Sequence, residues 1–175
     1  MPCVFADPSA PSRVLHVVDA DGLAGFLATQ PEGVRAWLTG SGFEAGLGDL
    51  RLIPGGQGVA AAVAGLGKAS ARARQRFGLA KVATALPSGN WHLEGDLDAS
   101  QRSEVALAWL LAQYRFDRYR PKKPAADLAL LKAPQGIDTA RLLAMAEGEF
   151  LTRDLINTPA ADMGPAELED AFLTL

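Results

Sequence analysis

The spacing of apolar residues near the start of the chain predicts one strand followed by two helices. Residues 13–18 form a short run rich in β-branched side chains, which is typical of a strand. Residues 23–28 then place apolar side chains at helical spacing, and Pro31 begins a second stretch of the same kind that ends near Gly40. We therefore expect a strand that leads into a pair of short helices.

Two further apolar runs, 50–54 and 59–66, flank the glycine-rich segment 55–58. This arrangement is typical of a β-hairpin, although the alanines in the second run are weak strand formers. Residues 70–86 follow, with apolar side chains on one face and basic side chains on the other. They predict a single amphipathic helix that ends before the turn at 87–90.

The same alternation continues toward the middle of the chain. Residues 91–94 predict a brief strand, Ser100 is expected to cap a helix over 101–114, and residues 126–131 predict another strand. Because strands and helices alternate over residues 13–131, the sequence predicts an α/β layered domain with a largely parallel or mixed sheet.

The character of the chain changes after the Ala-Pro-Gln-Gly segment at 133–136. Apolar residues recur at helical intervals over 137–156, which predicts one long helix. Pro159 stops this helix and Pro165 begins another one. A helix that follows a Pro/Gly break and carries acidic residues on its other face fits a connector between two domains.

Composition places the chain among ordinary globular proteins. With 49% hydrophobic and 21% charged residues in 175 positions, it can build one core without disulfides or a structural metal. The single cysteine, Cys3, has no partner for an internal disulfide and is expected to be a bystander in the N-terminal segment. Because neither a secretory signal nor an apolar run of about 18 residues is present, we expect a soluble, cytoplasmic protein without a membrane segment.

The common catalytic and nucleotide-binding motifs do not match this sequence. Near Gly67 and Lys68, a phosphate loop would need a hydroxyl residue where Ala69 stands. The dinucleotide pattern would need Gly or Ala at Ser70, so Gly65 and Gly67 are interpreted as turn and packing residues. The two histidines, His16 and His92, are far apart in sequence and have no ligand-like neighbours, so no metal role is assigned to them.

Two basic clusters are the candidate contact sites for nucleic acid or for another subunit. The first cluster includes Lys81, and Asp117 opposes the second. Aromatic residues interleave with the second cluster, as on nucleic-acid surfaces, but the net charge of −3 favours solvated faces and subunit contacts. The candidate contact residues are Arg72, Arg74, Arg76, Arg115, Arg118, Arg120, Lys122 and Lys123.

Two segments carry a resemblance to a known family. Residues 152–165 read Thr-Arg-Asp-Leu-Ile-Asn-Thr-Pro-Ala-Ala-Asp-Met-Gly-Pro, and residues 114–119 read Tyr-Arg-Phe-Asp-Arg-Tyr before Lys122 and Lys123. The first closely resembles the Arg-Asp-Leu-Val/Ile-Asn-x-Pro-x-x-x-Met-x-Pro pattern at the end of the interdomain helix of M17 leucyl (cytosol) aminopeptidases. The second is similar to the Tyr-x-Phe-x-x-Tyr-Lys stretch of the same family.

The resemblance implies a macro-domain-like α/β fold and a non-catalytic N-terminal domain. In this family two divalent metal ions, zinc or manganese, are bound by Lys, Asp and Glu residues of the C-terminal domain, around an Asn-Thr-Asp-Ala-Glu-Gly-Arg signature. Here Asn157 and Thr158 match only its first two positions, so the chain is expected to contain no catalytic residue, no metal ligand and no cofactor, and to be inactive alone.

The resemblance also implies a domain division and a set of partners. Residues 1–133 would form the N-terminal domain, 134–157 the linker helix and 158–175 the truncated start of the catalytic domain. The expected partners are that catalytic domain and the other subunits of a hexamer. Two alternatives stay open: a nucleic-acid-binding module that uses the basic clusters at 72–81 and 115–123, and a macro-like domain that binds a nucleotide or ADP-ribose.

Overall fold

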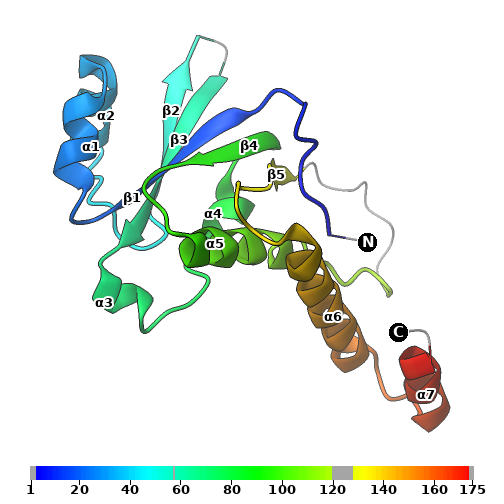
Figure 1. Ribbon diagram of the computed structural model, residues 1–175. Coiled ribbons are helices and arrows are strands. Elements are labelled where there is room, and N and C mark those ends of the chain that lie inside the picture. The colour runs from blue at the N-terminus through cyan, green and yellow to red at the C-terminus, as the bar shows by residue number, and fades with distance from the viewer. Residues whose placement is uncertain (1–2, 57, 120–127, 174–175) are drawn as a thin grey trace.

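One mixed sheet of five strands organises the chain (Figure 1). The structure is a computed structural model that describes residues 3–56, 58–119 and 128–173. Its strands are β1 (Arg13–Asp19), β2 (Leu50–Gly55), β3 (Gly58–Gly67), β4 (Gly89–Glu94) and β5 (Ala129–Leu131). They lie in the order β2-β3-β1-β4-β5, with β2 antiparallel to β3 and the other neighbours parallel. The predicted mixed sheet and the predicted hairpin are both confirmed.

Helices cover both faces of this sheet (Figure 1). They are α1 (Leu23–Thr29), α2 (Glu32–Gly40), α3 (Ala69–Arg72), α4 (Ala80–Ala85), α5 (Ala99–Leu111), α6 (Thr139–Asn157) and α7 (Pro165–Leu173). The α1–α2 pair lies on one face, and α4 and α5 lie on the other. Helix α6 packs against α5, and α7 lies farther from the sheet. The predicted α/β layering is therefore confirmed.

The alternation of side chains along β1 divides the core into two parts. Leu15 points into the larger part, which also contains the fully buried Trp91 and Trp109. Val18 points to the other face and packs with Leu38 of α2. Successive side chains of a strand point to opposite faces of the sheet, so β1 packs against the helices on both faces.

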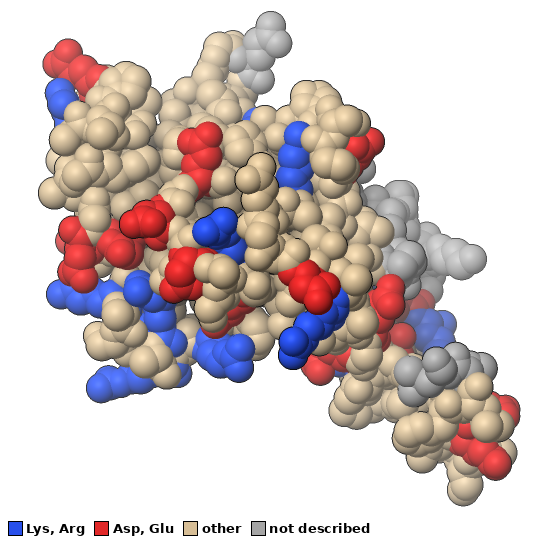
Figure 2. Space-filling model, in the orientation of Figure 1, with Lys and Arg blue, Asp and Glu red and all other residues tan. Residues whose placement is uncertain are grey.

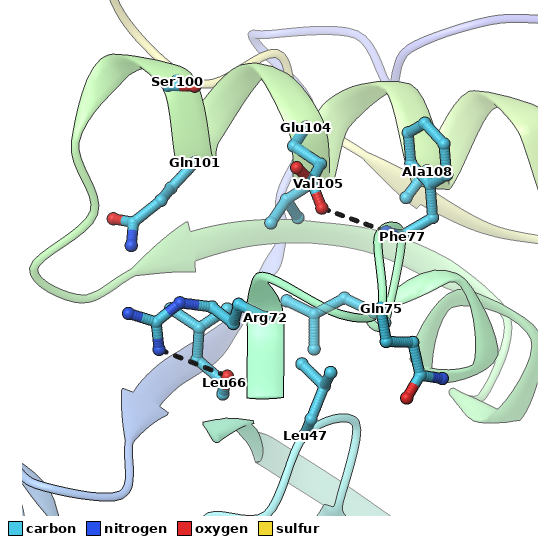
Figure 3. Close-up of a pocket in the computed structure, with 12 residues that line it drawn as sticks. Leu47, Leu66, Arg72, Gln75, Phe77, Ser100, Gln101, Glu104, Val105 and Ala108 are labelled. Carbon is cyan, nitrogen blue, oxygen red and sulfur yellow. Dashed lines mark hydrogen bonds between the residues drawn. The ribbon is translucent and has the colours of Figure 1, made fainter. Parts of the chain in front are cut away.

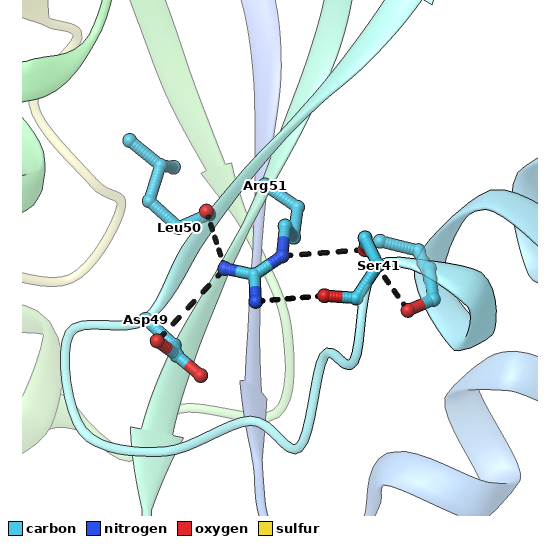
Figure 4. A network of polar contacts seen from close by, with 5 residues as sticks. Ser41, Asp49, Leu50 and Arg51 are labelled. Carbon is cyan, nitrogen blue, oxygen red and sulfur yellow. Dashed lines mark hydrogen bonds and ion pairs between the residues drawn. The ribbon is translucent and has the colours of Figure 1, made fainter.

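Arg51 ties the end of α2 to β2 (Figure 4). Its Nε donates to Ser41 Oγ at 3.2 Å and its Nη2 to the Ser41 carbonyl oxygen at 3.1 Å. Nη1 donates to the Leu50 carbonyl oxygen at 2.9 Å and lies 3.9 Å from a carboxylate oxygen of Asp49. These bonds use the donors of the guanidinium within the fold, so we interpret Arg51 as structural.

The single helix predicted over residues 70–86 is wrong. The segment contains only the short helices α3 and α4, with turns between them. Phe77 has a φ of 56°, outside the helical region, and its N–H donates to Glu104 Oε1 at 3.0 Å. In a continuous helix that N–H would bond to the carbonyl four residues earlier. A carboxylate on α5 takes the bond instead, so a tertiary contact overrides the local helical pattern.

The predicted cap of the helix over residues 101–114 is also wrong. Helix α5 begins at Ala99, and its N-cap is Asp98 rather than Ser100. Asp98 Oδ1 accepts from the Gln101 N–H at 2.8 Å, and Gln101 Oε1 accepts from the Asp98 N–H at 2.9 Å. This reciprocal capping box satisfies two N–H groups at the helix start, which Ser100 alone would not do.

Candidate interdomain junction

Tyr114 joins the chain after α5 to the last turns of α6. Its hydroxyl donates to Asp154 Oδ1 at 2.9 Å and accepts from Asn157 Nδ2 at 2.9 Å. Its ring meets Phe150 edge-on at 5.2 Å between ring centroids, and the Arg153 guanidinium lies 5.2 Å from the Tyr114 ring. Burial raises the pKa of the Tyr114 hydroxyl, with opposing contributions from Asn157 and Asp154. Two segments about forty residues apart are thus held together by one side chain.

Arg118 and Tyr119 continue this junction beyond the end of α6. Arg118 Nη1 donates to Thr158 Oγ1 at 3.4 Å, and the buried Thr158 hydroxyl donates to the Asp154 carbonyl oxygen at 2.7 Å. The Tyr119 hydroxyl donates to Asp162 Oδ2 at 2.6 Å, which raises the pKa of Tyr119. The two sequence segments that carry the family resemblance therefore lie against each other and fix the direction in which the chain leaves α6.

Apolar side chains are exposed just where the chain leaves this junction. Ile156 at the end of α6 is 76% exposed, and Phe172 and Leu173 on α7 are 66% and 78% exposed. None of the described residues of α7 is buried. A surface of this kind is typical of an interface with another domain or subunit.

The structure uses several of the predicted contact arginines inside the fold. Arg72 Nη1 donates to the Gly67 carbonyl oxygen at 2.9 Å and to that of Leu66 at 3.4 Å. Arg76 Nε lies 3.8 Å from Glu104 Oε2. Arg115 Nε lies 3.6 Å from Asp117 Oδ2, and Arg118 belongs to the junction. Carboxylates beside Arg76 and Arg115 offset part of their charge. Arg72 and Arg118 keep their charge, but each has one donor occupied by a neutral oxygen of the fold.

The two basic clusters lie in different parts of the molecule. The first surrounds α3, where Figure 2 shows basic side chains with acidic ones beside them. The second begins after the C-terminal end of α5, near α6. Arg74 belongs to the turn after α3, whereas Arg120, Lys122 and Lys123 lie outside the described residues. A nucleic-acid contact at these clusters stays a prediction.

His16 and His92 lie on the same face of the sheet, on either side of Glu94. His16 Nδ1 is 3.5 Å from Glu94 Oε2, and His92 Nε2 is 3.7 Å from Glu94 Oε1. His92 Nδ1 is also 3.0 Å from Ser12 Oγ. Among the described residues, however, no three His, Cys, Asp or Glu side chains are grouped so that they could hold a metal ion.

The free energy of unfolding is expected to decrease on acidification because of His16. Burial lowers the pKa of His16 more than the Glu94 carboxylate raises it, and His92 lowers it further. Below about pH 6.5, the ordinary pKa of histidine, the unfolded chain therefore binds a proton at this position before the folded chain does. The free energy of unfolding should decrease as pH falls from about 6.5, and His16→Gln should weaken this dependence in urea titrations.

The variant Glu94→Gln should change the pH dependence of stability in the opposite direction to His16→Gln. Removing this carboxylate takes away the charge that raises the His16 pKa. The loss of stability on acidification should therefore become steeper than in the unmodified chain. An identical pH dependence in all three proteins would contradict the assignment to His16.

A wide hollow of about 660 Å³ lies at the carboxyl ends of β4 and β5. Its charged lining residues are Glu94, Asp96, Arg102 and Lys132, so two carboxylates oppose two cations. Arg102 also donates to the carbonyl oxygens of Leu97 and Gln135. This balance does not favour a diphosphate, and nucleotide binding stays a prediction.

Comparison with known proteins shows which family the chain belongs to. The sequence model described as the N-terminal domain of M17 aminopeptidases matches residues 14–134. The chain belongs to the M17 aminopeptidase family. A probable cytosol aminopeptidase of Leifsonia xyli subsp. xyli is 30% identical over 167 residues, which cover 85% of this chain and 32% of that protein. The resemblance inferred from residues 114–119 and 152–165 is confirmed.

Three solved structures are similar in fold to this chain. The cytosol aminopeptidase of Coxiella burnetii superposes with a TM-score of 0.81 at 29% identity, covering 98% of this chain and 36% of that one. The bottromycin maturation enzyme BotP superposes with a TM-score of 0.66 at 25% identity, covering 94% of this chain and 37% of that one. A tomato leucine aminopeptidase mutant gives 0.64 at 20% identity, covering 94% and 39%, and so shows the fold alone. The chain spans about a third of the length of these relatives. It corresponds to their N-terminal part.

Of the described residues, none lies in a helix long and apolar enough to cross a membrane.

Proposed function

We propose that this chain is the non-catalytic assembly and regulatory domain of a two-metal leucine aminopeptidase that removes N-terminal residues from peptides. The observation that carries the proposal is the junction, where Tyr114, Arg118 and Tyr119 hold the end of α6 and the turn before α7. A rigid connection of this kind would present the apolar residues of α6 and α7 to a catalytic domain.

The proposal assigns peptide hydrolysis to the part of the parent protein beyond residue 175. Metal-assisted hydrolysis needs ligands that hold the ions and lower the pKa of the attacking water. The described residues do not provide such a ligand group. They therefore do not fit the zinc or manganese pair of the family, and no catalytic step is assigned to them.

The proposed division of labour follows the chain. Residues 1–133 would form the N-terminal domain, 134–157 the linker helix and 158–175 the start of the catalytic domain. The exposed apolar side chains Ile156 and Phe172 support a contact with that domain. Contacts with other subunits of a hexamer would use the basic clusters, and the name of the Leifsonia relative supports a cytoplasmic location.

A chimaeric enzyme tests this proposal directly. Residues 1–175 would replace the matching N-terminal third of the Coxiella burnetii relative. The 175-residue chain alone should not hydrolyse leucine p-nitroanilide with zinc or manganese, whereas the chimaera should. Hydrolysis by the chain alone would overturn the non-catalytic role. An inactive chimaera beside an active, unmodified relative would overturn the proposed partnership.

The junction is tested in the same chimaera with Tyr114→Phe. This change deletes the hydroxyl that contacts Asp154 and Asn157, at a cost of about 0.5–1.5 kcal/mol because both bonds are exposed, and should lower both the melting temperature and the activity. Trp37→Phe is the control, because it also removes one partly exposed hydrogen-bond donor, the Nε1 that bonds the Leu52 carbonyl oxygen, but it lies on α2, far from the junction in Figure 1. An equal loss of activity in both variants would contradict a specific role for Tyr114.

A further inference from the structure

A small cavity of about 120 Å³ lies where the connections of two neighbouring parallel strands diverge (Figure 3). β1 leads to α1 on one face of the sheet, whereas its neighbour β3 leads through α3 to the opposite face. In open α/β sheets, ligands bind outside the carboxyl ends of the strands at such a point. The cavity lies between the end of β3, the turns after α3 and the first half of α5.

The volume of this cavity restricts the class of ligand. A cavity of about 150 Å³ holds benzene, and sites for drug-sized ligands occupy about 300–1,000 Å³. A nucleotide is therefore too large, whereas a branched side chain of three or four carbons fits. The apolar lining agrees with such a group, since it includes Leu47, Leu66, Leu79 and Val105.

Polar groups surround this apolar interior on two sides (Figure 3). On one side, Arg72 Nη1 donates hydrogen bonds to the carbonyl oxygens of Leu66 and Gly67, and these bonds fix the position of the guanidinium. The other N–H groups of Arg72 can then donate to a ligand. Gln101 lies on the same side, and because its Oε1 accepts the Asp98 N–H, its amide NH₂ group is oriented as a donor. Together they form a site suited to a carboxylate.

Glu104 provides the opposite charge on the other side of the cavity. Its Oε1 accepts the Phe77 N–H at 3.0 Å, which holds the carboxylate at the cavity wall. Arg76 lies 3.8 Å away at an exposed position, so it neutralises this charge only weakly. A carboxylate fixed in this way can accept hydrogen bonds from an ammonium group.

We propose that this cavity binds a free aliphatic α-amino acid such as leucine or valine. The ligand carboxylate contacts Arg72 and Gln101, its ammonium group contacts Glu104, and its side chain fills the space beside Leu66 and Val105. The proposed aminopeptidase would release such molecules, so the site would respond to the product. Binding itself does not depend on that function, and either one can be found without the other.

Analogues of leucine test the site on the unmodified 175-residue chain. Isothermal titration calorimetry should give saturable binding of L-leucine at millimolar concentration. 4-Methylpentanoate lacks the ammonium group and L-leucinamide lacks the carboxylate, so each should bind at least about tenfold more weakly. In ¹H–¹⁵N spectra, L-leucine should shift the amide signals of Phe77 and Gln101. Absence of L-leucine binding up to about 50 mM, or equal binding of all three compounds, would overturn the proposal.

Two substitutions test which group of the ligand each side chain contacts. Glu104→Gln keeps an oxygen that can accept the Phe77 N–H but removes the negative charge. It should therefore weaken the binding of L-leucine at least about tenfold and leave the binding of 4-methylpentanoate unchanged. Arg72→Gln should weaken the binding of both L-leucine and 4-methylpentanoate. Arg74→Gln is the matched control, because Arg74 lies in the adjacent turn and does not line the cavity. A Glu104→Gln variant that binds L-leucine as tightly as the unmodified chain would overturn the assigned ammonium site.

Discussion

Replacing Trp109 with alanine is expected to lower the free energy of unfolding by about 5 kcal/mol. Trp109 is 1% exposed and fills the space between α5 and the edge of the sheet. Its Nε1 donates to the Ala129 carbonyl oxygen of β5 at 2.7 Å. The substitution leaves a cavity and also deprives a buried carbonyl of its donor, and both effects act in the same direction.

Urea titrations of two further variants separate these effects. Trp109→Phe retains much of the apolar contact but loses the Nε1 donor, so it should cost about 1–3 kcal/mol. Trp37→Ala changes a tryptophan that is 48% exposed, and it should cost about 1 kcal/mol. Similar losses for Trp37→Ala and Trp109→Ala would contradict the assigned place of Trp109 in the core.

The parts of the fold that depend on local patterns could be predicted from the sequence. β1 and the hairpin of β2 and β3 are confirmed, because β-branched runs and a glycine-rich turn specify them within a few residues. The long helix is also confirmed, although α6 begins at Thr139, after the N-cap Asp138. In each case the side chains that form the element lie next to one another in the sequence.

The elements that depend on distant contacts could not be predicted in this way. The break at Phe77 requires Glu104, which lies 27 residues farther along the chain. Helical periodicity over 70–86 contains no information about that partner. Phe77 and Gly78 of this break line the small cavity, so the sequence pattern gave no reason to select Gln101 and Glu104 as site residues. The Asp-x-x-Gln spacing of Asp98 and Gln101 is the signal that could have located the helix start.

The junction shows the same limit in another form. The family resemblance identified residues 114–119 and 152–165 as separate segments. Their contact rests on side-chain bonds such as Tyr114 to Asp154 and Tyr119 to Asp162, which only the folded chain brings together. Arg72 and Arg118 were selected for their charge, but the structure gives both of them specific partners within the fold.

Replacing Gly65 with alanine should lower the free energy of unfolding by about 3 kcal/mol, although it adds a single methyl group. Gly65 lies in β3 beneath the loop that precedes β2, and a Cβ there would be 2.1 Å from the Gly46 carbonyl oxygen and 2.4 Å from the Ala45 carbonyl carbon. Both atoms belong to the backbone, and two bonds hold the loop: Gly48 N–H to the Gly65 carbonyl oxygen, and Gly65 N–H to the Asp49 carbonyl oxygen. The loop must therefore move as a unit to make room.

The same substitution at Gly148 should have the opposite sign. Gly148 lies inside α6, where an added Cβ would meet nothing within 4 Å, so alanine should raise stability by about 0.5–1 kcal/mol through its higher helix propensity. Thermal unfolding should place the Gly65→Ala midpoint about 10 °C below that of the unmodified chain and the Gly148→Ala midpoint slightly above it. A Gly65→Ala protein with an unchanged midpoint would show that the loop yields easily, and it would contradict the interpretation of Gly65 as a packing residue.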